Sequence, residues 1–303
     1  TEGWQRREAA MQDGLSEVVE LKDGRALGLA HFGDRSGAPV FFFHGFPGSR
    51  LEGGLTDQSA AAAAVHIIAL DRPGFGLSDY AARRTIGSWA DDVAEVAAAL
   101  GIARFGVVGV SGGGSYALAC ARRTPDRLTG VAFVSGLAPP QAPGIPQAFR
   151  RNATIFKIGR VAPFVPRMLL ANMARKLRRN PNDLRDYLLP IVPPADRALL
   201  ERDDVADLLR RDQLEAFRHG ARGATRESLL LVSPWDFRLE NIRIPVHVWQ
   251  GEADIQVSPE SARWLVSRLP HGVPHFVPGG GHYSVIIEET PAILAAVVGQ
   301  SVA

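Results

Sequence analysis

The 303-residue sequence contains a single cysteine, Cys120, so no disulfide can form within the chain. A lone cysteine in an apolar helical pattern is typical of a small buried hydrophobe rather than a reactive thiol. No uninterrupted apolar run reaches the ~18–20 residues that a membrane-spanning helix needs. The residues after Thr1 contain no apolar core of a signal peptide, although a leader removed before Thr1 would leave no trace. The sequence therefore predicts a cytoplasmic protein without a membrane span.

An excess of charge of either sign is also missing. The 34 basic and 32 acidic residues give a formal net charge of +2, which does not favour nucleic acid as a partner. Hydrophobic residues make up 46% of the chain and charged residues 22%, as in an ordinary globular protein. The chain contains no internal repeat and no low-complexity segment.

Short apolar runs alternate with helical patterns along most of the chain. A turn at 22–25 between runs 17–21 and 26–33 predicts an antiparallel hairpin. Further strand-like runs without polar alternation fit parallel strands that are covered on both faces; they lie at 40–45, 66–71, 105–111, 131–136, 246–251 and 275–280. Helical patterns separate most of them, at 88–101, 114–125, 261–269 and 290–300. The order predicts an α/β fold with a doubly wound, mostly parallel sheet and an antiparallel start.

One interval is far longer than an ordinary connection between a strand and a helix. Roughly a hundred residues separate the runs 131–136 and 246–251, and they begin proline-rich and continue in helical patterns. We expect residues 137–235 to form a helical cap inserted into a body made of residues 1–136 and 236–303.

The stretch VVGVSGGGSYALACARR contains a G-x-S-x-G motif after a predicted strand and before a predicted helix. A sharp turn at this point places Ser111 at an exposed, strained apex. Gly109 and Gly113 let the strand and helix approach without a clash of Cβ atoms. Neither a dinucleotide motif nor a phosphate-binding loop fits these glycines. The motif predicts that Ser111 is a nucleophile.

A serine hydroxyl needs a base, and the base needs an acid that orients it. Asp254 and His282 each follow a late predicted strand, and the order Ser, Asp, His is that of a serine triad on an α/β sheet. We expect the three to meet beyond the carboxyl ends of the strands. His282 would accept the serine proton, and Asp254 would fix the histidine tautomer.

Other residues of the same types are less well placed for these roles. Glu252 and Asp236 are the alternatives to Asp254, but Asp236 precedes a strand rather than following one. His271 and His275 lie near the last strand but not in the loop after it, and His219 lies within the predicted cap.

Acyl transfer also needs donors for a developing negative oxygen. The HGFPGS stretch after the run 40–43 provides the backbone N–H of Phe46. The N–H of Gly112, next to the nucleophile and at a helix N-terminus, provides the second.

The segments HGFPGS, DRPGFGLSD, GVSGGG, GEAD and GGGHYS together resemble the α/β-hydrolase superfamily, of the serine type with a helical cap between strands six and seven. The resemblance implies an eight-stranded, mostly parallel sheet flanked by helices. It also implies a Ser111–His282–Asp254 triad with Phe46 and Gly112 as oxyanion donors, and a structural role for residues 71–79, including Ser78.

These features predict an esterase that forms an acyl-enzyme on Ser111 with a small-molecule, largely apolar ester. No metal or organic cofactor is needed, because the nucleophile is the protein's own. A carbon–carbon bond hydrolase, an aminopeptidase-type amidase and a perhydrolase remain alternatives on the same triad, as does a slow-turnover ligand receptor. Several apolar residues fit either an acyl site or ordinary packing; they are Phe46, Phe149, Phe156, Phe164 and Met168.

Overall fold

A computed structural model describes residues 15–144, 154–180 and 182–299. Its sheet has eight strands in the order β1-β2-β4-β3-β5-β6-β7-β8. Their bounds are β1 (Ser16–Glu20), β2 (Ala26–Gly33), β3 (Ala38–Phe43), β4 (Val65–Leu70), β5 (Phe105–Val110), β6 (Leu128–Val134), β7 (Val246–Gly251) and β8 (Gly272–Val277). β2 pairs antiparallel with β1 and β4, and the other pairings are parallel, which confirms the predicted fold class.

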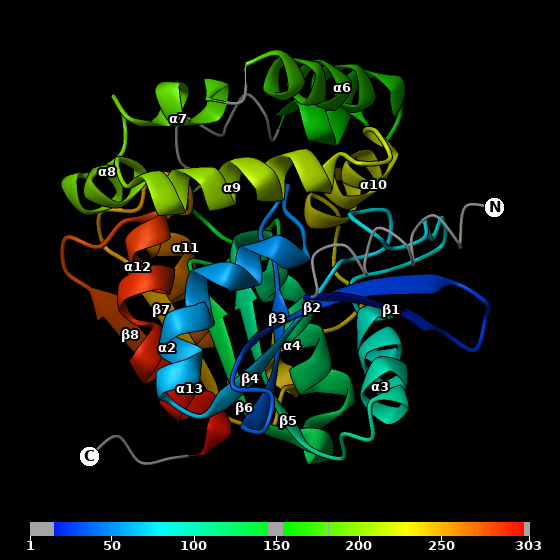
Figure 1. Ribbon diagram of the computed structural model, residues 1–303, viewed down its shortest axis with the longest axis vertical. Coiled ribbons are helices and arrows are strands. Elements are labelled where there is room, and N and C mark those ends of the chain that lie inside the picture. The colour runs from blue at the N-terminus through cyan, green and yellow to red at the C-terminus, as the bar shows by residue number, and fades with distance from the viewer. Residues whose placement is uncertain (1–14, 145–153, 181, 300–303) are drawn as a thin grey trace.

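Helices cover both faces of the sheet (Figure 1), and alternating side chains of the strands fill one core on each face. On β3, Phe41 and Phe43 enter the first core, while Val40 and Phe42 enter the second. The first core is covered by α3 (Trp89–Ala99), α4 (Gly114–Arg123) and α11 (Pro259–Arg268). The second is covered by α2 (Asp57–Ala62), α12 (His282–Glu288) and α13 (Thr290–Val298). Burial on both faces explains why these strands lack polar alternation.

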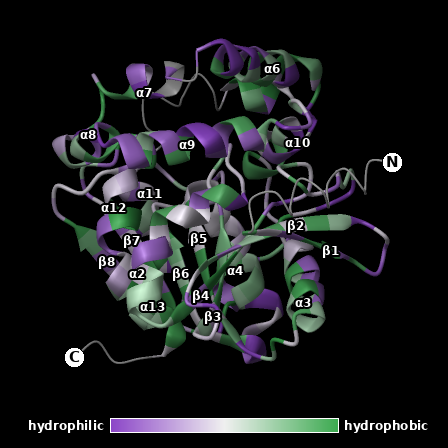
Figure 2. Cartoon of the chain, viewed as in Figure 1, coloured by the Kyte–Doolittle hydropathy of each residue, from purple (hydrophilic) through white to green (hydrophobic). Residues whose placement is uncertain are grey.

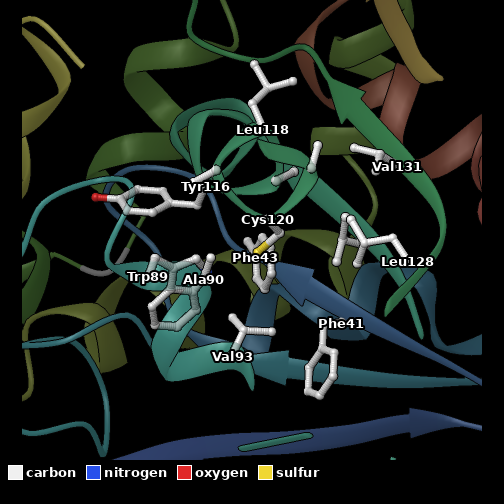
Figure 3. Close-up of a cluster of buried hydrophobic side chains, with 14 of the residues drawn as sticks. Phe41, Phe43, Trp89, Ala90, Val93, Tyr116, Leu118, Cys120, Leu128 and Val131 are labelled. Atoms are coloured by element: carbon white, nitrogen blue, oxygen red, sulfur yellow. The ribbon is translucent and has the colours of Figure 1, made fainter. Parts of the chain in front are cut away.

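Cys120 belongs to the first core, where Figure 3 shows it among Phe43, Trp89 and Tyr116. The thiol is fully buried, and this burial raises its pKa. The interpretation of Cys120 as a small buried hydrophobe is therefore confirmed.

Local signals explain where several helices begin and end. The Ser258 side chain accepts the N–H of Glu260 at the start of α11, and Pro259 occupies its first turn. α13 ends at Val298 and is followed by Gly299, which has a φ of 76° in the left-handed region. Short 3-10 helices complete the body; they are η1 (Arg50–Thr56), η2 (Ser111–Gly113), η3 (Pro125–Arg127) and η4 (Leu239–Asn241).

A group of helices, here called the upper layer, lies between β6 and β7 in the sequence and together above the sheet in Figure 1. It comprises α6 (Phe164–Arg179), α7 (Asp183–Leu188), α8 (Pro194–Leu200), α9 (Asp203–Ala216) and α10 (Arg222–Leu231). Figure 2 shows that α9 is mostly hydrophilic on the side in view. On the inner side, Leu170 and Phe217 pack with Phe75 of the body. Throughout the described ranges, every helix is too short or too polar to cross a membrane.

Two parts of the body differ from the expectation. The last strand begins at Gly272 rather than His275, and it is half-buried along its length because it lies at the sheet edge. The glycine-rich stretch around 279–281 indicated only a loop, but α12 begins immediately after it, at His282.

Candidate active site

Ser111 occupies a tight corner between β5 and α4. Its φ is 52°, in the left-handed region that non-glycine residues seldom adopt. Such a conformation costs on the order of 1–3 kcal/mol and persists only where the surrounding structure imposes it. The backbone carbonyl of Ser111 accepts the N–H of Leu137 at 2.9 Å, which ties the corner to the end of the neighbouring strand β6.

Glycines on both sides of Ser111 permit this corner. A Cβ on Gly113 would lie 2.7 Å from the carbonyl oxygen of His44, and it would also collide with the carbonyl of Phe43. A Cβ on Gly109 would lie 2.9 Å from the Cβ of Ala117. Both positions therefore need glycine for reasons of space.

Asp254 and His282 come together at the carboxyl ends of β7 and β8. The Nδ1 of His282 is 2.9 Å from the Oδ2 of Asp254, and both side chains are buried. The Oδ1 of Asp254 accepts the backbone N–H groups of Gln256 at 2.7 Å and Val257 at 2.9 Å, while the Gln250 amide donates to Oδ2 at 3.1 Å. These contacts fix the carboxylate so that it holds the proton of the imidazole on Nδ1 and leaves Nε2 as an acceptor.

The charge state of His282 reflects opposing effects. Burial lowers its pKa, but the charge and hydrogen bond of Asp254, with smaller effects of Asp196 and Glu52, raise it, and the net shift is upward. The site therefore stabilises the imidazolium.

Ser111 makes no hydrogen bond to His282 in the described part of the chain, and Glu52 lies near both residues. A Cβ on Gly45 would lie 3.4 Å from the Ser111 Cβ and 3.4 Å from both carboxylate oxygens of Glu52. Glu52 also interacts electrostatically with His282. Hydrogen bonds between nucleophile and base are often long in a free enzyme and shorten when substrate binds.

The two predicted oxyanion donors are neighbours. A Cβ on Gly112 would lie 3.4 Å from the backbone nitrogen of Phe46. Within the ranges that the structure describes, the N–H groups of Phe46 and Gly112 have no hydrogen-bond acceptor.

Arg72 holds the loop that carries Phe46, a role that sequence analysis missed. Its guanidinium is fully buried and donates to the carbonyl of His44 and, at 2.8 Å, to that of Gly45. Its Nε donates at 2.8 Å to Glu227 of α10. The only local signal was an arginine directly after a buried strand, in the DRPG segment.

His44 is not a candidate base. Its Nε2 accepts the backbone N–H of Arg72 at 3.2 Å, so the proton lies on Nδ1, which donates to the carbonyl of Gly45 at 2.8 Å. Burial and the Arg72 charge lower the pKa of His44 well below its usual value. The imidazole is therefore a neutral structural group.

Glu52 is a second residue that sequence analysis missed, since nothing in the stretch RLEGG marks it as part of a site. Its buried carboxylate accepts the N–H of Gly45 at 2.5 Å. Burial raises its pKa, against the lowering effects of that N–H group, Arg72 and His282. Nearby, Asp212 of α9 accepts both the N–H and the hydroxyl of Ser49 at 2.7 Å.

The residues considered as alternatives to Asp254 and His282 make contacts elsewhere. Glu252 forms a surface ion pair with Arg263 at 2.6 Å, and Asp236 accepts the N–H of Gly87 at 2.8 Å. His275 hydrogen bonds with His247 at 3.0 Å. None of these contacts reaches Ser111 or His282.

The apolar candidates divide into three groups. Phe156 packs edge-on against Phe46, with ring centroids 6.1 Å apart. Phe164 and Met168 of α6 are 63% and 69% exposed, so these two side chains do not pack in a core. Phe149 lies outside the described residues.

Ser78 has the structural role expected of it. Its hydroxyl donates to the carbonyl of Asp71 at 2.6 Å and accepts the N–H of Gly28 at 2.9 Å. Across the described ranges, no cluster of three or more His, Cys, Asp or Glu side chains is arranged to hold a metal ion.

Comparisons with known proteins agree on the fold. A family model described as the alpha/beta hydrolase fold matches residues 38–289. The RutD protein of Caulobacter sp. (strain K31), named as a carbamate hydrolase, is 30% identical over 198 residues. The match covers 65% of this chain and 66% of RutD, so this chain spans just under two thirds of the length of that relative.

Solved structures show the same fold at lower identity. An alpha/beta hydrolase fold protein from Nakamurella multipartita is 19% identical, with a TM-score of 0.68 over 92% of this chain and 96% of the other. A thermophilic esterase from Thermogutta terrifontis is 23% identical, with a TM-score of 0.65 over 92% and 96% of the two chains.

Proposed function

Because the chain belongs to the α/β-hydrolase fold family, we propose that it is a serine hydrolase that cleaves carboxylic esters through an acyl-enzyme on Ser111. The observation that carries the proposal is the buried Asp254–His282 pair, hydrogen-bonded at 2.9 Å. It lies at the same edge of the sheet as the strained serine. A carboxylate, an imidazole and a serine at a tight corner are the parts that acyl transfer needs.

The proposed reaction gives each of these groups one role. Ser111 Oγ attacks the ester carbonyl while Nε2 of His282 accepts its proton, and Asp254 stabilises the imidazolium. The N–H groups of Phe46 and Gly112 bind the carbonyl oxygen as it becomes negative. The imidazolium then protonates the leaving alcohol, and a water molecule deprotonated by His282 hydrolyses the acyl-enzyme.

The contacts between the upper layer and the body favour an apolar substrate. We propose that residues 137–235 act as a cap over the body of residues 1–136 and 236–303. Phe156 packs against Phe46 beside the cluster that Phe75 forms with α6 and α9, so the surface next to the loop that carries Phe46 is aromatic. A largely apolar acyl group fits such a surface.

The test is labelling with a fluorophosphonate probe, combined with hydrolysis of p-nitrophenyl esters of increasing acyl length. The wild-type protein should be labelled once and hydrolyse a short ester. Ser111→Ala should lose the label and reduce turnover on the order of 10⁴-fold or more.

The matched control is Ser267→Ala, because Ser267 is an exposed serine that donates only to the carbonyl of Trp264. This variant should behave as the wild type does. A wild-type protein that binds ester ligands but is neither labelled nor active would contradict the proposal and favour a receptor.

A further inference from the structure

Asp196 links the upper layer to the backbone of His282. It lies on α8 and is fully buried. Its Oδ2 accepts the N–H of His282 at 2.7 Å, and its Oδ1 accepts the N–H groups of Tyr283 at 3.1 Å and Ser284 at 2.8 Å. These are the first residues of α12, whose N–H groups have no partner within the helix. A carboxylate from 86 residues earlier in the chain therefore caps the helix that begins with His282.

The loop before His282 is shaped to admit this carboxylate. A Cβ on Gly281 would collide with the carboxyl group of Asp196. The N–H of Gly281 donates to the hydroxyl of Ser284 at 2.7 Å, which closes the same turn. The third glycine of GGGHYS thus leaves room for a side chain of the upper layer.

The contact is also electrostatic. In the described part of the chain Asp196 forms no ion pair. Its negative charge acts on the N-terminus of α12 and on the imidazole of His282. The acidic groups that act on the imidazole come from three other segments: Asp254 after β7, Asp196 of α8 and Glu52 of η1. Tyr283 is the adjacent titratable side chain, packed edge-on against the ring.

We propose that Asp196 is a positioning residue for the proposed hydrolase, on whose activity this inference rests. By binding the backbone of His282, Asp196 holds the imidazole against Asp254, so that the base is in place only while α8 rests on α12. Asp196 touches no reacting atom and acts through the histidine.

The test compares Asp196→Ala, Asp196→Asn and Gly281→Ala with the wild type. The measurements are kcat and KM for a p-nitrophenyl ester across pH, an NMR titration of the His282 ring, and thermal unfolding. Asp196→Ala should lower kcat by up to about 100-fold, the cost of a small displacement of a catalytic group. Asp196→Asn keeps an acceptor oxygen and should recover part of kcat. Both should move the His282 titration to lower pH, because the charge that favours imidazolium is gone.

Gly281→Ala keeps the charge but displaces the carboxylate, so kcat should fall in this variant as well. Asp236→Asn is the matched control, because Asp236 also accepts a backbone N–H group, that of Gly87, together with the hydroxyl of Thr85, ahead of α3, and contacts neither Ser111 nor His282. It should leave kcat and the His282 titration unchanged.

A merely structural Asp196 would lower the unfolding temperature but leave kcat per folded molecule and the His282 titration at wild-type values, which would overturn the inference. If Asp196→Ala does not fold, the same comparison is made with Asp196→Asn and Gly281→Ala. Failure of the proposed function is distinguishable: the wild type would then not be labelled at Ser111, whereas the His282 titration would still report on the Asp196 contact.

Discussion

Replacement of Asp254 by asparagine isolates the role of one carboxylate oxygen. Oδ1 accepts two backbone N–H groups, from Gln256 and Val257, and Oδ2 faces Nδ1 of His282 and the amide of Gln250. In the variant, the amide oxygen takes the Oδ1 position, since an NH₂ group there would oppose two N–H donors. The NH₂ group then faces His282 and donates to Nδ1.

The size of the effect follows from this orientation. With Nδ1 accepting, the neutral imidazole carries its proton on Nε2, and it cannot accept the serine proton. The same change of tautomer in a serine protease lowers kcat about 10⁴-fold, which corresponds to about 5.5 kcal/mol in activation free energy. We expect a loss of this order for Asp254→Asn. The fold should be retained, because the two backbone N–H contacts of Oδ1 remain.

The assay is the rate of p-nitrophenol release under single-turnover conditions, with the rate of fluorophosphonate labelling as a second measure. Asp236→Asn serves as the control for loss of a carboxylate outside the site. A folded Asp254→Asn protein with activity within tenfold of the wild type would refute the reasoning and assign the acid role to another residue.

Two further predictions concern pH and stability. The rate of ester hydrolysis should rise with pH, with an inflection above 6.5, because the pKa of His282 is raised above the usual histidine value and only the neutral imidazole accepts a proton. A stopped-flow pH profile measures this inflection. An inflection below pH 6.5 would contradict the prediction. Glu227→Ala leaves the buried guanidinium groups of Arg72 and Arg84 without their carboxylate and should cost about 3–5 kcal/mol in urea unfolding. Burial raises the pKa of Glu227, but Arg72 and Arg84 lower it to a net value below 4.5, so its stabilisation of the wild type should be present above pH 4.5 and lost as pH falls further.

The sequence was sufficient for those parts of the fold that local patterns encode. The strand-like runs at 40–45 and 105–111 correspond to β3 and β5, because an unbroken apolar run is what a strand covered on both faces requires. The corner at Ser111 was predictable for a similar reason, since only small residues fit around it.

Contacts between distant segments were not predictable. Glu227 lies 155 residues from Arg72, and Asp196 lies 86 residues from His282. A single sequence gives no signal for such a pair, because its local pattern does not distinguish a buried acidic residue from an exposed one on an amphipathic helix. The exposed positions of Phe164 and Met168 were missed because the spacing of apolar residues does not say which side of α6 faces the body.

Three buried acidic residues of the upper layer bind separate segments of the body. Asp212 binds Ser49 in the loop after β3, Glu227 binds Arg72, and Asp196 binds the backbone of His282. A chimaera whose replacement helices lacked acidic residues at these three positions would lose all three contacts at once. We therefore expect a transplanted upper layer to fit this body only if it supplies acidic residues that match these three contacts.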